Sequence, residues 1–163
     1  MEAVFQRMLS TRPSIAQLWN AVKELPGGPG MFSRLIGQLS PHSGSLGARV
    51  LRLEDGGVEV FLKDRRILFG ADGSLHVSVL ANLAELTTGL AVQYVVDRRG
   101  EAVLKSLTIE ALAPSMGSVT ASCDDLVPVR AGRYSPSLVA TIRDDDGVVV
   151  ARATTTWDVY LGR

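Results

Sequence analysis

Four polar side chains interrupt an apolar stretch near the middle of this sequence. Ser78, Asn82, Glu85 and Thr88 are separated by four, three and three residues, which places them on one face of a helix. A carboxylate on a mostly buried helix costs free energy unless it is paired, hydrogen-bonded or protonated. Glu85 is therefore either a general base in a binding site or a structural group that pairs with an arginine or caps a neighbouring backbone group. The spacing alone leaves both interpretations open.

His76 and Gly89 flank Glu85 in the chain. His76 precedes it by nine residues, half a turn round an ideal helix, so the two side chains cannot share one helical face. We expect His76 either to pack at the beginning of the helix or to reach the site from the first turn. Gly89 follows Glu85 by four residues, which leaves space beside the carboxylate.

The helix that carries these residues is predicted over roughly residues 74–90 or a little beyond. Its other side chains are apolar nearly all round, a pattern typical of a helix buried on most sides. Alternating residues predict two strands before it and four after it, over 46–53, 58–63, 104–113, 118–124, 137–143 and 148–161. The turn at Asp55-Gly56-Gly57 and the regular spacing of the later strands favour antiparallel pairing. We predict an α+β fold in which an antiparallel sheet of about six strands wraps around a long central helix.

The first forty residues are predicted to be helical. Ser14 is suited to cap a helix over 15–25, residues 26–30 end it, and a shorter helix is expected over 31–39 before Pro41. We interpret residues 1–40 as a helical extension that covers one edge of a main domain over 41–163. A helix lying on a membrane surface is the alternative, but its polar face would carry too little positive charge.

Composition narrows the class of protein. The 163 residues suit one soluble domain, and 17 basic residues balance 17 acidic ones, so no overall field attracts nucleic acid or an anionic membrane. The single cysteine, Cys123, cannot form an internal disulfide and is expected to be a small buried side chain. Two histidines and no Cys/His cluster leave a zinc site without ligands. Because neither a secretory signal nor a membrane-spanning run is recognisable, we expect a cytoplasmic protein without membrane insertion.

The stretch from Gly73 to Glu85 resembles the helix motif of the hot-dog-fold thioesterase superfamily. In the phenylacetate-pathway branch this motif is a histidine and two glycines, followed by an apolar stretch that ends in Leu-Ala-Asp or Leu-Ala-Glu. His76 matches the histidine, and Leu83-Ala84-Glu85 matches the end at the same spacing. The sequence looks closest to a poorly characterised bacterial subgroup of acyl-CoA thioesterases. The resemblance is clear over residues 44–124, and in the remainder of the chain it lies in the order of the predicted strands. It implies a hot-dog fold.

The resemblance also implies roles for individual residues. Glu85 would act as general base, or as nucleophile, toward a thioester carbonyl, with Asn82 orienting it or a water. His76 is the third catalytic candidate, and the backbone amides of Val77 and Ser78 would polarise the carbonyl oxygen. The phosphates of coenzyme A would meet basic side chains at four positions, Arg65, Arg66, Lys105 and Arg130.

The implied substrate is an acyl-CoA or another acyl thioester. Coenzyme A is then part of the substrate, and neither a separate cofactor nor a metal is expected. Members of the superfamily join two sheets edge to edge, so we expect a homodimer or a dimer of dimers with sites at the dimer interface.

Two positions depart from the motif. Gly70 stands where the superfamily commonly has an asparagine six residues before the histidine, and Val77 and Ser78 replace the two glycines. Asp72 either substitutes for the asparagine or caps the helix. Two functions are therefore open, a thioesterase and a non-catalytic acyl- or lipid-binding dimer. A dehydratase or hydratase is less favoured because its usual His–Asp helix motif is not matched.

Overall fold

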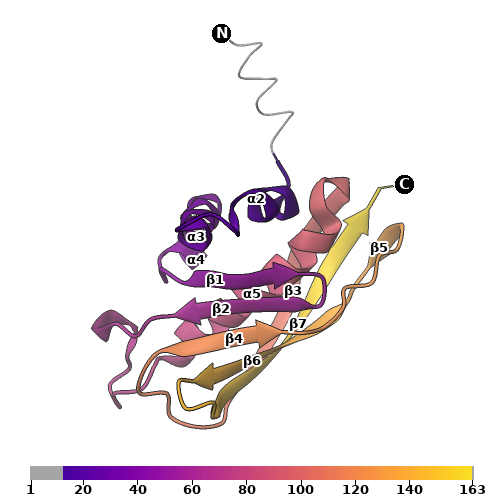
Figure 1. Cartoon of the computed structure of the whole chain (residues 1–163). Helices are drawn as coiled ribbons and strands as arrows, with labels where there is room; N and C mark the ends of the chain where they lie inside the picture. Colours follow the sequence, from indigo (N-terminus) through magenta and orange to yellow (C-terminus); the bar gives the residue numbers. More distant parts are fainter. Residues whose placement is uncertain (1–12, 163) are drawn as a thin grey trace.

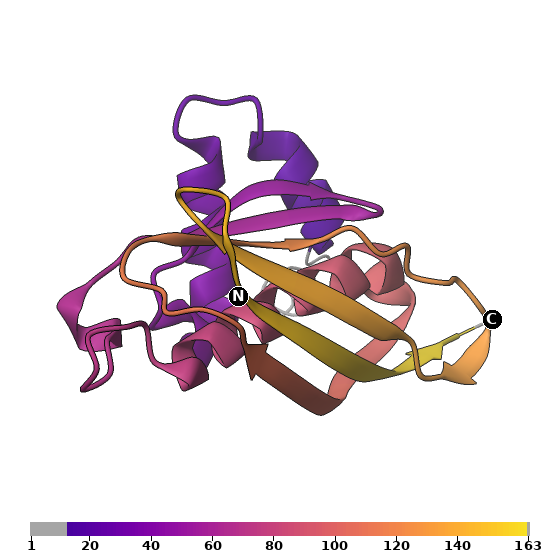
Figure 2. The ribbon, with the colours of Figure 1, turned by 90° about the horizontal axis from the view of Figure 1, so that it is seen from below.

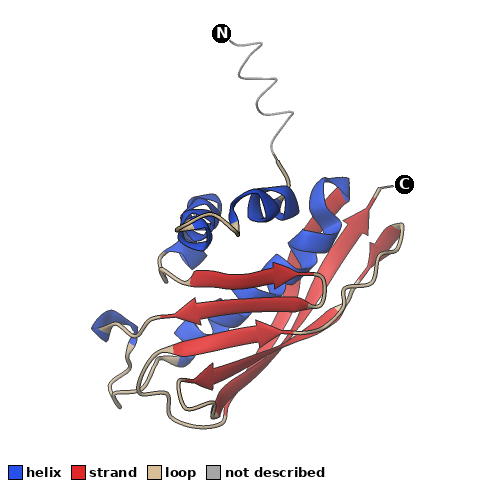
Figure 3. Cartoon of the chain, viewed as in Figure 1, coloured by secondary structure: helices blue, strands red, loops and turns tan. Residues whose placement is uncertain are grey.

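The chain forms a curved antiparallel sheet with one long helix against its inner face and short helices along one edge (Figures 1 and 3). The structure, a computed structural model, describes residues 13–162. The strands are β1 (Arg49–Glu54), β2 (Gly57–Leu62), β3 (Gly100–Ala111), β4 (Val119–Cys123), β5 (Gly132–Tyr134), β6 (Ser137–Asp144) and β7 (Val149–Leu161). Their order is β1-β2-β4-β6-β7-β3, and β5 pairs with β7 beside this path. The predicted α+β hot-dog architecture is confirmed, with β5 as an additional short strand.

Alternation along the strands decides which face meets the helix. In β2, Val58, Val60 and Leu62 are fully buried, whereas Glu59 and Phe61 between them are only partly covered. The predicted turn before β2 is present, and Gly56 adopts a positive φ of 71° there, a conformation that glycine accepts without a steric cost. Strands β4, β6 and β7 continue the buried face, and Figure 2 shows them crossing the long helix.

The long helix is α5 (Val77–Val96), which begins three residues later and ends six residues later than predicted. It begins later because Leu75 forms a β-bridge with Phe69, which holds the chain extended up to His76. It ends later because four of the residues 91–96, Ala91, Val92, Val95 and Val96, are also apolar and buried. The segment Val77–Arg99, which includes α5, is long and apolar enough to cross a membrane, but 61% of its apolar window is buried inside the protein. This burial is typical of the core helix of a soluble protein.

Within the described residues, three helices precede the sheet: α2 (Ile15–Val22), α3 (Gly28–Leu39) and α4 (Pro41–Gly44). Ser14 caps α2 as predicted, and its hydroxyl accepts the N–H of Gln17 at 3.0 Å. Helix α3 begins three residues before its predicted start because Pro29 occupies its first turn, where a proline costs no hydrogen bond. The division at residues 40 and 41 stays a prediction, since α4 follows α3 directly and the helices pack on β1 and α5.

Cys123 confirms the expectation of a buried side chain. Its residue is 0% exposed, and burial raises the pKa of the thiol to about 11. A thiol with this pKa is almost entirely protonated at neutral pH, which makes it a poor nucleophile.

Candidate active site

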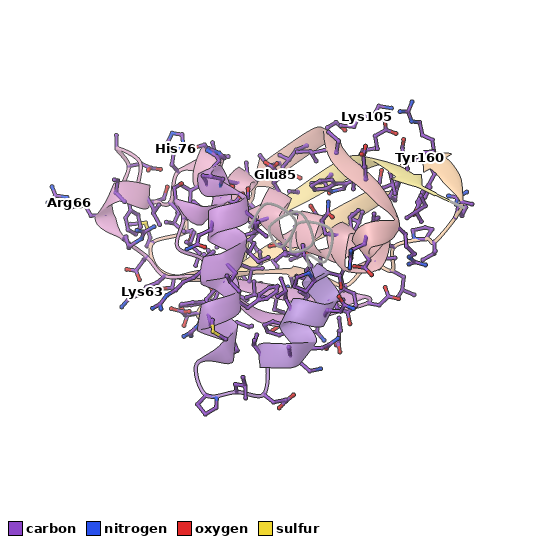
Figure 4. All side chains as sticks on the ribbon, turned by 90° about the horizontal axis from the view of Figure 1, so that it is seen from above. Lys63, Arg66, His76, Glu85, Lys105 and Tyr160 are labelled. Atoms are coloured by element: carbon purple, nitrogen blue, oxygen red, sulfur yellow. The ribbon has the colours of Figure 1, made fainter. Side chains whose placement is uncertain are left out.

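Glu85 lies in the middle of α5 and is half-buried (Figure 4). Its carboxylate forms no hydrogen bond or ion pair with any residue from 13 to 162. Each of the four ion pairs in that part of the chain joins other residues, and none involves α5. The arginine clamp that would make Glu85 a structural residue is therefore absent from the described chain.

The two polar neighbours of Glu85 on the predicted stripe are buried. Asn82 is only 8% exposed, because α4 passes over it and the side-chain amide donates to the carbonyl of His42 at 3.4 Å. Thr88 is fully buried, and its hydroxyl donates to the carbonyl of Ala84 at 3.0 Å. The four polar residues thus share one side of the helix as predicted, but α4 and the sheet cover its flanks. Ser78 and part of Glu85 stay accessible.

The side-chain oxygen of Asn82 has no hydrogen-bond partner among the described residues. A buried amide oxygen without a donor costs free energy, and such groups often serve a ligand, a water or a catalytic neighbour. Asn82 precedes Glu85 by three residues, so the two side chains lie on adjacent turns of the same side of α5.

The space that Gly89 leaves is filled. A Cβ built on Gly89 would lie 3.0 Å from Cη2 of Trp157, so the glycine accommodates the indole edge rather than a cavity beside the carboxylate. The indole N–H donates to the hydroxyls of Thr155 at 3.1 Å and Thr88 at 3.3 Å. Trp157 therefore closes the surface of α5 one turn beyond Glu85, a role that a local sequence pattern does not reveal because the tryptophan lies 72 residues further along the chain.

His76 caps the beginning of α5. Its Nδ1 accepts the backbone N–H of Ser78 at 3.2 Å and lies 2.7 Å from the Ser78 hydroxyl. The N–H of Ser78 is consequently engaged within the helix, whereas the N–H of Val77 has no hydrogen-bond partner among the described residues. Of the two amides predicted to polarise a carbonyl, Val77 is the one left free.

A cleft of about 620 Å³ opens at this end of α5. It is lined by residues 70–72, 74–77, 80 and 111–115. Asp72 accepts the N–H and hydroxyl of Ser74, and these hydrogen bonds hold the pKa of the Asp72 carboxyl below its ordinary value of 3.8. Asp72 thus does not cap α5, whose N-cap is His76, and its substitution for the missing asparagine stays a prediction. Gly70 is crowded, since a Cβ there would lie 3.2 Å from Oδ1 of Asp72 and 3.6 Å from Cδ2 of His76.

Ser115 lies at the far side of this cleft and was not predicted from the sequence. It is 2% exposed, and its hydroxyl has no hydrogen-bond partner among the described residues, while its carbonyl accepts the N–H of Leu75 at 2.8 Å. A lone serine after the proline in Ala113-Pro114-Ser115 carries no local signal of a site.

The four basic residues predicted to meet phosphates do not form one cluster within the chain. Arg65 donates to the carbonyls of Ser45 and Leu46, so it anchors the N-terminal helices. Arg130 stacks over the Tyr134 ring at 5.3 Å. Arg66 in the short helix η1 (Arg66–Leu68) and Lys105 at the β3 bulge lie at opposite ends of the view in Figure 4. No group of three or more potential metal ligands occurs among residues 13–162.

The chain is similar to a protein family of unknown function and to several solved structures. The model of a family described as a domain of unknown function, DUF4442, matches residues 28–159. Among curated proteins, none matches this sequence. The structural-genomics protein APC5556 superposes with a TM-score of 0.75 at 26% identity, over 91% of this chain and 99% of its own.

Two further solved structures carry functional names. The protein PA5026 from Pseudomonas aeruginosa, called a probable thioesterase, has a TM-score of 0.70 at 21% identity, over 84% of this chain and 97% of its own. A mutant of the phenylacetic acid degradation protein PaaI from Thermus thermophilus has a TM-score of 0.63 at 25% identity, over 75% of this chain and 100% of its own.

Proposed function

The chain belongs to the DUF4442 family and has the hot-dog fold of the thioesterase superfamily, and from this premise we propose that it hydrolyses an acyl-CoA or a related acyl thioester. The observation that carries the proposal is the carboxylate of Glu85. It is half-buried on the central helix, without an ion pair or hydrogen bond to any described residue, while its polar neighbours are buried. A carboxylate held in this way is available to a water molecule.

In the proposed reaction Glu85 is the general base. Its carboxylate removes a proton from a water molecule as the water oxygen adds to the thioester carbonyl carbon. The tetrahedral intermediate then collapses, the carbon–sulfur bond breaks, and the proton passes from Glu85 to the leaving thiolate. The products are a carboxylic acid and a thiol, and Glu85 returns to its ionised form.

The carbonyl oxygen needs a donor, and the free N–H of Val77 at the positive end of α5 is the candidate. Eight residues separate Val77 from Glu85, which is about 12 Å along a helix that rises 1.5 Å per residue. One chain therefore cannot bring both groups to one carbonyl. We propose that a second copy supplies the amide, so that each site combines Glu85 of one protomer with Val77 of the other.

Strand β3 supports this dimer. It is a twelve-residue edge strand with a described neighbour, β7, on one side only, and its inward side chains Leu104, Leu107 and Ile109 are only partly buried. Long uncovered edge strands usually pair or are protected. Pairing of β3 with its copy would continue the sheet, cover these apolar side chains and bring Lys105 to the junction, where it could contact a coenzyme A phosphate.

A non-catalytic acyl-binding dimer is the second candidate. The crowding around Gly70 favours it, because Asp72 and His76 occupy the space where related enzymes place a polar helper. For both functions we propose a soluble cytoplasmic protein.

The test compares wild-type protein with Glu85→Gln on a panel of acyl-CoA thioesters. Loss of the base is expected to lower kcat at least a hundredfold, with an unchanged circular dichroism spectrum and melting temperature. Glu24→Gln, at an exposed position between α2 and α3, is the matched control and should retain full activity. Turnover that survives in Glu85→Gln would remove Glu85 from the mechanism. Absence of hydrolysis across the panel, with a lipid retained in native mass spectrometry, would select the binding function.

A further inference from the structure

A second cavity, of about 530 Å³, lies outside the site described above. It is bounded by α3, by α4 and by the beginning of β1, and Leu86 of α5 forms part of its wall. Its size falls within the range of small-molecule sites. The residue that follows Glu85 in the chain therefore faces a cavity on the side of α5 that the N-terminal helices cover.

The walls combine apolar surface with unbalanced positive charge. Ile36, Ala48, Val50 and Leu86 supply the apolar part. Arg34 and Arg49 also line the cavity, and among the residues that the structure describes no Asp or Glu does. Neither arginine forms an ion pair with any residue from 13 to 162. Because guanidinium groups stay charged at all physiological pH values, the cavity carries a permanent positive potential.

Two further contacts restrict arginine side chains in and beside the cavity. The guanidinium of Arg49 lies 5.9 Å from the centre of the Phe61 ring, which restricts its position. The guanidinium of Arg65, fixed on the carbonyls of Ser45 and Leu46, lies against Gly47, and Gly47 lines the cavity. Two arginines therefore line this cavity and a third lies beside one of its lining residues, and no acidic side chain of residues 13–162 lines it.

The cavity walls are held by specific contacts. The hydroxyl of Ser33 donates to the carbonyl of Pro29 at 2.6 Å and accepts the N–H of Val50 at 2.9 Å, which ties α3 to the edge strand β1. At the other end α3 meets α4 closely, since a Cβ on Gly44 would lie 2.3 Å from the carbonyl oxygen of Gly37. These contacts fix the distance between the helices and the strand.

We propose that this cavity binds an apolar chain that ends in a carboxylate, with the chain against Ile36, Val50 and Leu86 and the carboxylate between Arg34 and Arg49. Planar guanidinium groups pair with carboxylates through two parallel hydrogen bonds. The carboxylate has two possible sources, a free fatty acid or the distal carboxylate of an acyl group. Binding of a free fatty acid does not depend on the proposed hydrolysis, whereas the second source rests on it.

The first experiment is isothermal titration calorimetry of the full-length protein with octanoate and with octanol. Octanoate is expected to bind at least tenfold more tightly than octanol. The double variant Arg34→Gln/Arg49→Gln should lose this difference, whereas Arg34→Lys/Arg49→Lys should keep part of it because the charge is retained. Lys23→Gln, an exposed cation outside the cavity, is the control. Equal binding of octanoate and octanol, or unchanged octanoate binding by a folded Gln double variant, would overturn the proposal.

The second experiment separates the two sources. If the carboxylate belongs to the acyl group, kcat/KM for adipyl-CoA should exceed that for hexanoyl-CoA, and the preference should disappear in the Gln double variant. If it belongs to a free fatty acid, the two thioesters should react alike while octanoate still binds. Tight binding of free coenzyme A that the Gln double variant abolishes, without octanoate binding, would assign the arginines to phosphate and contradict the proposal. If wild-type protein hydrolyses thioesters but does not bind octanoate, the proposed fatty-acid site is wrong and the proposed hydrolysis still holds.

Discussion

Gly89 and Trp157 meet across the interior of the protein, where the glycine leaves room for the edge of the indole ring. The distance of 3.0 Å between a Cβ on Gly89 and Cη2 of Trp157 is shorter than a normal van der Waals contact. The indole cannot easily move away, because its N–H is hydrogen-bonded to Thr88 and Thr155 and its residue is 6% exposed. The indole of Trp157 therefore covers α5 at Gly89, one turn beyond Glu85.

Gly89→Ala should therefore lower the free energy of unfolding. Alanine favours a helix over glycine by up to about 1 kcal/mol, but overpacking against a fixed side chain costs about 1–3 kcal/mol, and we expect the second effect to prevail. Urea unfolding followed by circular dichroism measures the difference. Gly30→Ala in α3 is the control, since its Cβ meets nothing within 4 Å and stability should stay unchanged or rise. A Gly89→Ala protein more stable than the wild type would show that Trp157 yields.

His76 is expected to contribute through its cap on α5. His76→Ala removes the acceptor for the Ser78 N–H and should cost about 0.5–2 kcal/mol, while His76→Asn should recover most of that because asparagine is a good N-cap. Chemical denaturation gives the stability, and acyl-CoA hydrolysis gives a second readout. A His76→Asn protein that is as stable as the wild type but inactive would assign His76 to the chemistry instead.

The buried thiol of Cys123 predicts a dependence on alkaline pH. Burial raises the pKa of the thiol from 9.0 to about 11, so the unfolded chain releases this proton at a lower pH than the folded chain. The stabilisation is complete below pH 9.0, and it is lost as the pH rises from 9.0 towards 11. The difference in unfolding free energy between wild type and Cys123→Ala should therefore narrow or reverse over this range. A difference that is independent of pH would contradict the pKa shift.

The same burial predicts slow alkylation. At pH 8 iodoacetamide should modify Cys123 much faster in urea-unfolded protein than in folded protein, because only a protonated and inaccessible thiol is present in the fold. Mass spectrometry of timed samples gives both rates. Similar rates in the two states would mean that the strand around Cys123 opens readily.

A charge on β3 tests the proposed dimer. Val103 is 65% exposed on this edge strand, two residues from Lys105, and Val103→Lys should weaken dimerisation at least tenfold by placing further positive charge along the junction. Sedimentation velocity over a range of concentrations measures the effect. Val139→Lys on β6, within the sheet, is the matched control and should leave the dimer intact. A Val103→Lys protein that dimerises like the wild type would move the interface away from β3.

Local patterns predicted much of this protein. The alternation of Val58, Val60 and Leu62 identified a strand with one buried face, and the apolar stretch around Leu83 identified a buried helix. Both signals depend on periods of two and 3.6 residues, which are properties of neighbours in the chain. The motif that ends in Glu85 is likewise a pattern of residues that are neighbours in the chain. The hot-dog fold and Glu85 as the first candidate for the general base could therefore be predicted from the sequence.

Contacts between distant residues had to come from the tertiary structure. The predicted free space beside Gly89 is occupied by Trp157, and Asn82 is covered by the chain at His42, forty residues earlier. The resemblance predicts that Arg65 meets a phosphate, but its guanidinium donates to two carbonyls at the end of the N-terminal helices. The sequence by itself determined the elements and the carboxylate at their centre, because backbone preference and burial pattern are local. Only the tertiary structure decided which neighbours leave Glu85 accessible and which amide stays free, because those outcomes depend on which distant segments pack against α5.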